Sequence, residues 1–291
     1  YLEEYFESEV IKAHMAGSAI IGTALGPYSP GSAYVLLHHY MGEVDGNVGA
    51  WGYARGGMGS ITQAMSKSLL ANGGNIKAGS AVKNILIKNN RTYGLALENG
   101  DEIYADKIVS NLDVKRTFLK VVEKKELPSE FYTAVKNFKI RGSSGKLNIA
   151  LDDKPIWKSI PKDDPASTGD LHFTQSIEEM EGAYDDWKDG KWSTLPYVDM
   201  CIPTLNDPTM APQGKHYMSV FVQYVPYNLA DGGWTEEKRV QFGDHVMKRI
   251  GNYSTNFKDI ILHAEVRTPK ELEAEVGLTE GNIFQGELTM D

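Results

Sequence analysis

The sequence predicts a mixed α+β fold in which helices accompany an antiparallel or mixed sheet. Three observations predict it. Apolar residues recur at helical spacing, with capping signals, in residues 1–20, 61–71 and 235–253. Residues 82–111 alternate between apolar and polar side chains around tight turns. After residue 145, isolated strand-like runs are separated by long polar connections.

The first 41 residues are predicted to form two helices. Residues 1–20 place apolar side chains at near-helical spacing and leave an acidic outer face. The segment 26–32 contains two prolines and two glycines, which break a helix. Residues 33–41 fit either a strand or a helix, and we favour a helix.

A glycine-rich loop leads into a third predicted helix. Ser60 can cap it, with Gln63 returning a hydrogen bond to the Ser60 amide, so the helix is expected to start near Ile61. The apolar residues form one stripe that we expect to face a core: Ile61, Ala64, Met65 and Leu69. Asn72 and the two glycines after it are expected to end the helix.

The loop before this helix has two possible roles. Free amides at a helix N-terminus attract anions, and Gly56, Gly57 and Gly59 would let a phosphate approach the backbone near Ser60. However, Thr62 stands where a dinucleotide fingerprint has its third glycine, and the Gly-Lys-Ser/Thr of a P-loop is missing. A tight connection between packed elements is therefore favoured over phosphate binding.

The clearest β signal is a predicted meander in residues 82–111. Two strands are expected on either side of Asn89–Asn90, and Asn99–Gly100 is a strong second turn signal. A further short strand at residues 108–109 is expected to end at Ser110–Asn111.

The rest of the chain alternates predicted strands with capped helices. The strands are expected within residues 145–151, 197–203 and 216–225. An acidic, aromatic helix is expected in the segment 178–191, and Thr235 caps a longer one. The last predicted helix has Thr268 and Glu271 as a capping box and ends at Gly277.

Composition limits the class of protein. The 291 residues suffice for one large or two modest domains, and 41% hydrophobic with 24% charged residues is typical of a globular chain. A net charge of −9 disfavours nucleic acid as the main partner. The single cysteine, Cys201, can form no disulfide within the chain, and we expect a buried thiol.

The sequence also bears on location. The longest weakly polar stretch, residues 16–26, is too short to span a bilayer. We therefore expect no transmembrane segment and a cytoplasmic protein, or a mitochondrial matrix protein in a eukaryote, with peripheral membrane contact left open. The sequence gives no indication of the oligomeric state.

Few side chains point to chemistry by pattern alone. His38 and His39 are adjacent and diverge, so they make a poor metal pair, and no metal site is predicted. Trp51 and Tyr53 flank small residues with Arg55 nearby, so a flat ligand could lie against this loop. The alternative is that the two aromatic rings only fill a domain junction.

Taken together, residues 56–113 resemble the flavin-dependent phytoene desaturase and amine oxidase superfamily. The resemblance rests on motifs in the same order and spacing: Gly56-Gly57-Met58, the glycine stop at 73–74, the Ala81-Val82-Ile85 strand, the hairpin 94–100 and the "ADKIVSN" run at 105–111. Three other stretches resemble its phytoene dehydrogenase-like branch: "GAWGYARGGMG", "IPTLNDPTMAPQGKHYMSVFVQY" and "TPKELEAEVGLTEGNIFQGELTMD".

The sequence also departs from the superfamily. Its members begin with a Rossmann-type βαβ unit carrying a glycine fingerprint for FAD and end with a second glycine-rich flavin segment, and this sequence contains neither. We therefore interpret it as an internal fragment. Residues 1–55 and 113–291 would belong to a substrate-binding domain, and residues 56–112 to part of an FAD-binding domain.

The resemblance implies roles for particular residues. FAD would be the cofactor of the full-length protein, and we expect the fragment alone to lack it. Gly56, Gly57 and Met58 would lie near the isoalloxazine, the backbone at Val82 near the adenine end, and Ser110 and Asn111 beside the cofactor at a strand end. Trp51, Tyr53 and Asn282, in the loop 281–283, would face the substrate cavity. No catalytic residue is implied.

The implied activity is oxidation of a small apolar or amine substrate, with hydride passing from a C–H or C–N bond to FAD. The fragment alone is expected to be inactive. An alternative is a non-enzymatic module that binds a ligand or a protein in a groove near Trp51.

Overall fold

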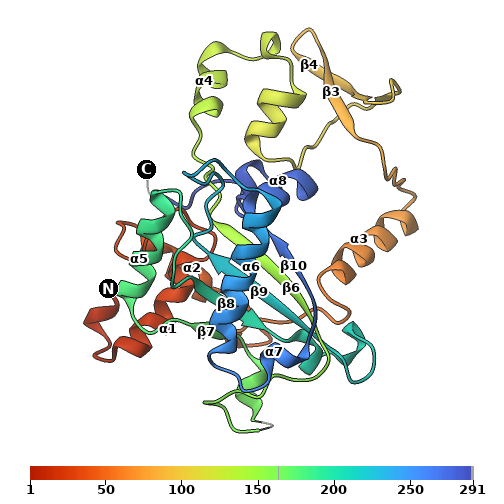
Figure 1. Cartoon of the computed structure of the whole chain (residues 1–291). Helices are drawn as coiled ribbons and strands as arrows, with labels where there is room; N and C mark the ends of the chain where they lie inside the picture. Colours follow the sequence, from red (N-terminus) through yellow and green to blue (C-terminus); the bar gives the residue numbers. More distant parts are fainter. Residues whose placement is uncertain (163, 290–291) are drawn as a thin grey trace.

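A computed structural model describes residues 1–162 and 164–289 of the chain. Asp163, Met290 and Asp291 lie outside the described residues. The last two end the stretch 268–291, which resembles the phytoene dehydrogenase-like branch. Figure 1 shows three parts, which we call the body (residues 1–55 and 141–289), the upper lobe (82–140) and the strap (56–81).

The body is built on a five-stranded antiparallel sheet. Its strands, in spatial order, are β10 (Ile261–Arg267), β6 (Ser144–Leu151), β9 (His216–Gln223), β8 (Tyr197–Cys201) and β7 (Leu171–Phe173). The predictions of β6, β8 and β9 are confirmed. The sequence analysis missed β7, which is too short to show a period, and β10, whose apolar and polar residues alternate only weakly.

One face of this sheet forms the main core. It packs against α6 (Glu236–Gly251) and α7 (Phe257–Ile260), and Figure 1 shows α6 crossing the sheet. Side chains alternate between the two faces of a strand, so every second residue enters this core. The core residues from the strands include Leu147, Ile149, Val198, Met200, Met218, Val220, Val222 and Val266.

A second cluster holds the N-terminal helices to the body. In it α1 (Glu9–Ile20) packs against α5 (Ile177–Lys188), and α2 (Ser32–Tyr40) lies beside α1. Tyr197 and Tyr224 are buried between these helices and the sheet. The expected helix over residues 1–20 is confirmed only for Glu9–Ile20, because Leu2–Glu4 form a separate 3₁₀ turn. The helices expected over 33–41 and in 178–191 are confirmed.

The upper lobe contains the predicted meander. β3 (Val82–Lys88), β4 (Arg91–Leu97) and β5 (Glu102–Tyr104) pair in sequence order, and Asn89 and Asn90 have φ of 51° and 58° in the β3–β4 turn. A π-helix, η2 (Arg116–Val121), and α4 (Ser129–Asn137) complete the lobe. The predicted strand at residues 108–109 is wrong, because this segment has no strand beside it within the described residues.

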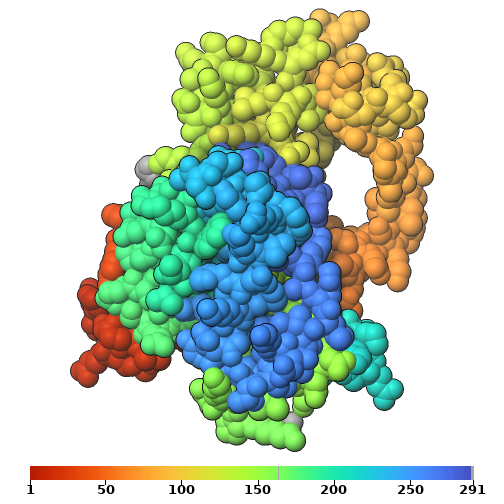
Figure 2. Space-filling model, in the orientation of Figure 1, coloured from red at the N-terminus to blue at the C-terminus, as the bar shows by residue number. Residues whose placement is uncertain are grey.

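The strap is exposed along its length. Its helix α3 (Gly59–Ala71) buries none of its residues, and Figure 2 shows an opening between the strap and the body. The expectation that the stripe of Ile61, Met65 and Leu69 faces a core is therefore wrong for the described chain. These three side chains are 45% to 67% exposed.

The predicted cap of α3 is also corrected. The helix begins one residue before Ser60, so Met58 is its N-cap residue and no side chain caps it. Ser60 lies inside the first turn, where its Oγ donates a hydrogen bond to the Gly57 carbonyl at 2.7 Å. The predicted end at Asn72 is confirmed.

The C-terminal helices follow their capping signals. The Thr235 side chain caps α6, and Thr268 and Glu271 form the capping box of α8 (Pro269–Val276), which ends at Gly277 with φ of 83°. The remaining short elements are β1 (Glu43–Val44), β2 (Asn47–Val48) and the 3₁₀ turns η1 (Leu2–Glu4), η3 (Lys124–Glu126), η4 (Pro165–Thr168), η5 (Pro203–Leu205), η6 (Pro208–Met210) and η7 (Thr279–Gly281). Across residues 1–162 and 164–289, every helix falls short of the length and apolar character needed to cross a bilayer.

Candidate functional site

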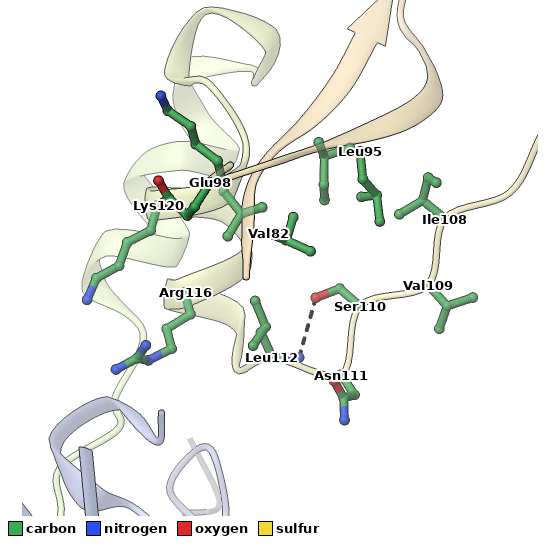
Figure 3. A pocket seen from close by; sticks show the side chains of 13 residues that line it. Val82, Leu95, Glu98, Ile108, Val109, Ser110, Asn111, Leu112, Arg116 and Lys120 are labelled. Atoms are coloured by element: carbon green, nitrogen blue, oxygen red, sulfur yellow. Dashed lines mark hydrogen bonds between the residues drawn. The ribbon is translucent and has the colours of Figure 1, made fainter. Parts of the chain in front are cut away.

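Val82, Ser110 and Asn111 line one cavity in the upper lobe. The cavity has a volume of about 450 Å³ and lies between the start of β3, the extended segment after β5, and η2 (Figure 3). Tertiary structure thus brings together three of the six residues that the resemblance implied for cofactor binding. The other three lie at the far end of the strap.

The cavity combines cations with apolar walls. Lys83, Arg116 and Lys120 line it, whereas Glu98 is its one carboxylate among the lining residues. Figure 3 labels Arg116, Lys120 and Glu98. Its apolar walls include Ile85, Leu95 and Ile108. An excess of positive charge beside apolar surface favours a ligand that has both an anionic group and a flat apolar part.

Ser110 and Asn111 differ in how free their side chains are. Ser110 Oγ lies 2.9 Å from Thr117 Oγ1 and accepts a hydrogen bond from the Leu112 amide at 3.3 Å (Figure 3). These bonds fix the turn into η2. Asn111 is exposed and its side chain makes no hydrogen bond to the described residues, so it is available to a ligand.

Asp113 is a buried residue of this region that sequence reasoning missed. Its carboxylate accepts hydrogen bonds from the Arg116 amide at 2.9 Å, the Thr279 amide at 3.0 Å and Thr279 Oγ1 at 2.7 Å. The available signal was an aspartate directly before a helix, the pattern of an N-cap. Its structural role is to join the upper lobe to η7 of the body.

The glycine loop at the base of the strap binds a carboxylate of the protein itself. Gly56 and Gly57 have φ of 80° and 81°, and the Gly56 amide donates a hydrogen bond to Asp207 Oδ2 at 2.6 Å. Because an internal anion already occupies this amide, the geometry favours a tight connection over a phosphate site at Ser60. Met58, next in the chain, is exposed.

Trp51 and Phe284, the residue after the loop 281–283, both lie against the ring of His39. Trp51 is 73% exposed, and its ring stacks on His39 with centroids 6.0 Å apart. The His39 ring in turn lies 6.3 Å from that of Phe284. His39 entered the sequence analysis only as a metal candidate, and its aromatic neighbours were not foreseen.

Asn282 does not face this aromatic surface. Its side chain is buried, Nδ2 donates to the Arg141 carbonyl at 2.8 Å, and Oδ1 accepts from the Phe284 and Gly286 amides. Its polar atoms are thus used in fixing the backbone of the loop. We therefore leave Asn282 out of the candidate substrate surface.

The sheet face opposite the core carries a row of mostly polar side chains, and we call this face the polar face. Register places one residue of each strand side by side across the sheet: Arg267, Lys146, Phe221, Asp199 and His172. All five are half-buried. Along each strand the residues of this row alternate with residues of the core. Successive side chains of a strand point to opposite faces of the sheet, so the residues of the row all lie on the face opposite the core.

Tyr53, which lies just before the strap, contacts the edge of this polar face. Its hydroxyl donates a hydrogen bond to Asp170 Oδ1 at 3.2 Å, and burial raises its pKa. Burial also raises the pKa of the Cys201 thiol, to about 11, so the thiol stays protonated at neutral pH. A protonated Cys201 thiol agrees with the buried thiol that we expected, and it argues against Cys201 as a nucleophile.

Lys146 stands near the centre of the polar face. Burial lowers its pKa, and within the described residues its amine has no hydrogen-bond or ion-pair partner. A half-buried amine without a partner is a candidate for ligand contact, because a structural lysine is normally paired or solvated.

These features agree with the comparison to known protein families. Residues 3–265 match the family described as flavin containing amine oxidoreductase. The chain belongs to this family. Membership in the amine oxidoreductase family favours an enzyme over the non-enzymatic binding module that the sequence left open, and it agrees with the predicted resemblance.

Individual relatives extend the comparison. The chain is 36% identical over its whole length to "Pyridine nucleotide-disulfide oxidoreductase domain-containing protein 2" of Rattus norvegicus, of which it covers 51%. It is 25% identical over 97% of its length to the "zeta-carotene-forming phytoene desaturase" of Myxococcus xanthus, of which it also covers 51%. The chain therefore spans about half the length of the curated relatives it matches.

A solved structure supports the fold. The crystal structure of an oxidoreductase from Methanosarcina mazei aligns with 90% of this chain and 56% of its own, with a TM-score of 0.56 and 18% identity. This likeness supports the mixed arrangement of helices and antiparallel sheet found in this member of the amine oxidoreductase family.

Proposed function

We propose that this chain forms the substrate-binding part and one wall of the flavin site of an FAD-dependent oxidoreductase. The enzyme would take hydride from a C–H or C–N bond of a small apolar or amine substrate. Residues 1–55 and 113–291 would serve the substrate domain, and residues 56–112 the flavin domain.

The observation that carries this proposal is the unpartnered strap. A 13-residue helix is marginal in water by itself, yet α3 presents an apolar stripe that touches no core in the described chain. The strap begins three residues after Tyr53, which contacts the edge of the polar face, and leads into β3 at Val82, which lines the cavity in the upper lobe. A cofactor domain packed on the stripe would therefore adjoin both candidate binding surfaces.

The residues that line the cavity in the upper lobe fit one end of FAD. A dinucleotide offers flat apolar rings and an anionic pyrophosphate, and the cavity offers apolar walls together with Lys83, Arg116 and Lys120. The backbone at Val82 and the free side chain of Asn111 would contact the adenine end. When bound, FAD supplies the electron acceptor for the oxidation.

The polar face and the aromatic residues near Trp51 would hold the substrate. Phe221 offers a flat apolar floor, and Lys146 and Asp199 stand on either side of it in the same row. Trp51 and Tyr53 would border the substrate from the base of the strap. This mixture suits a substrate that is mainly apolar and carries one polar group.

The location of the enzyme is part of the proposal. A single free cysteine fits a reducing compartment, so we place the protein in the cytoplasm, or in the mitochondrial matrix of a eukaryote. Its partner would be a small molecule, and contact with a membrane surface would be peripheral.

Flavin binding by the protein of the complete reading frame tests the proposal. We expect a yellow protein that holds one FAD per chain and is bleached anaerobically by an oxidisable amine or polyene. The 291-residue chain alone should bind FAD weakly in the same titration. Asn111→Ala should weaken FAD binding in the longer protein, whereas the exposed control Asp106→Asn should not. A colourless longer protein with no affinity for FAD would overturn the proposal.

A further inference from the structure

The edge of the polar face holds a cross-strand pair of an acid and a base. His172 on β7 lies directly opposite Asp199 on β8, with His172 Nε2 3.8 Å from Asp199 Oδ1. Sequence analysis singled out neither residue, because the two are brought together only by the pairing of the strands.

The histidine of this pair is held in a fixed position. His172 Nδ1 lies 2.7 Å from the hydroxyl of Tyr197, which is buried, and the His172 ring is 5.0 Å from that of His14 on α1. Gly17 of α1 lies directly over this bond, since a Cβ there would be 2.3 Å from the Tyr197 hydroxyl oxygen. With Nδ1 engaged, Nε2 is the ring nitrogen that faces Asp199.

The carboxylate is largely buried and lacks a strong partner. The Asp199 side chain is 16% exposed, and within the described residues its one polar contact is His172 at 3.8 Å. Burial lowers the pKa of His172, so that ring is neutral, and burial together with Asp170 raises the pKa of Asp199 to about 7. A carboxylate in such a setting costs stability unless it exchanges a proton or meets a ligand.

The other charged and titratable groups around Asp199 come from several elements. Asp170 precedes β7, Cys201 follows on β8, Tyr53 reaches over from the segment before the strap, and His14 approaches from α1. Lys146 stands two strands away in the same row, which is about 10 Å at the usual strand spacing. Phe221 lies between these two polar groups in the row.

We propose that Asp199 is the proton acceptor of the oxidation, and that His172 is the residue that positions it. This inference rests on the proposed function. Removing two hydrogens from a substrate sends one, with its bonding electron pair, to the flavin. The second hydrogen leaves the neighbouring carbon, nitrogen or oxygen as a proton and forms an O–H bond on Asp199. The electron pair left behind completes the new double bond, and the neutral acid later returns its proton to solvent.

Infrared titration of the FAD-bound, full-length protein tests the proton-holding role without any substrate. We expect a protonated-carboxyl band that disappears with a midpoint near neutral pH and is absent in Asp199→Asn. The matched control Glu265→Gln, on the same face but hydrogen-bonded by Asn148 and Arg267, should retain the band. His172→Phe should move the midpoint, which a purely structural histidine would not do. Titration that is unchanged in Asp199→Asn would overturn the proposal.

A labelling experiment tests whether a substrate can reach this position. Asp199→Cys in a Cys201→Ser background should react with methyl methanethiosulfonate in the FAD-bound protein, and decylamine should slow the reaction. Val240→Cys, at an exposed site on α6, reports the unhindered rate. A Cys variant at 199 that stays unmodified while the control reacts would overturn this inference alone. Failure of the longer protein to bind FAD would instead overturn the proposed function.

Discussion

Asp113 and Thr279 are 166 residues apart in the sequence, yet one Asp113 oxygen accepts hydrogen bonds from both the amide and the hydroxyl of Thr279. The other Asp113 oxygen accepts the Arg116 amide. This buried carboxylate therefore ties the start of η2 in the upper lobe to η7 in the body. The lobe lines the candidate flavin cavity, so its attachment matters for the geometry of that site.

Removal of this carboxylate should loosen the upper lobe. Asp113→Ala leaves donors of the half-buried residues Arg116 and Thr279 without partners, and we expect a loss of about 2 kcal/mol in the free energy of unfolding. Urea unfolding measures the loss, and faster amide hydrogen exchange in η2 locates it. The exposed control Asp106→Ala should stay within about 0.5 kcal/mol of the unmodified chain. Equal effects of the two variants would contradict a joining role for Asp113.

The uncovered helix of the strap predicts that one substitution will affect the unfolding free energy differently in the 291-residue chain and in a longer protein. Met65→Lys should change the unfolding free energy of the 291-residue chain by less than about 0.5 kcal/mol, because Met65 is exposed there. In the protein of the complete reading frame, the same substitution should cost about 2 kcal/mol or more if a second domain covers the stripe. Lys67→Gln, on the opposite side of the helix from the stripe, should be neutral in both proteins. Neutral behaviour of Met65→Lys in both would count against a docked domain.

The glycine loop should not tolerate a side chain. Gly57 has φ of 81°, and a Cβ there would lie 3.1 Å from Met210 Cε. We expect Gly57→Ala to lower the unfolding free energy by about 1–2 kcal/mol, since L-residues resist this conformation. Gly52→Ala serves as control, because its Cβ would meet open space and its φ is not positive. A Gly57→Ala variant as stable as this control would show that the loop relaxes freely.

The pKa of Asp199 predicts a pH-dependent stability. The folded chain holds a proton on Asp199 up to a pH of about 7, whereas an unfolded aspartate releases it near pH 3.9. The unfolded state therefore binds fewer protons between these values, and this group makes the folded state less stable as the pH rises through that window. Relative to the unmodified chain, Asp199→Asn should gain about 2 kcal/mol in unfolding free energy between pH 5 and pH 7.

Urea unfolding at a series of pH values measures this gain. The lowered pKa of His172 acts in the opposite direction, lowering stability as the pH falls below about 6.5, and the same series in a His172→Phe background separates this contribution from that of Asp199. A difference between the two proteins that stays constant with pH would contradict the raised pKa of Asp199.

Local signals account for the elements that sequence analysis placed correctly. The caps of α6 and α8 and the Asn89–Asn90 turn depend on contacts within four or five residues, so the sequence encodes them directly. The prediction of a strand at residues 108–109 was wrong for the complementary reason. A strand exists only when another strand lies beside it, and no local pattern reveals whether one is present.

The candidate site divides in a similar way. Motif order identified Val82, Ser110 and Asn111, and the structure brings them to one cavity. Asn282 matched the resemblance equally well, but its amide turns inward because the backbone of its own loop needs the hydrogen bonds. A motif gives a position along the chain and does not give the direction of a side chain.

By itself the sequence determined the family, the helix limits set by caps and the antiparallel meander, since each depends on residues that are close together in the chain. Only the tertiary structure decided that α3 stays uncovered, that Asp113 joins the lobe to the body, and that His172 faces Asp199 across two strands. The physical reason is that burial and cross-strand contact depend on which distant segments come together, and this is set by packing of the whole chain.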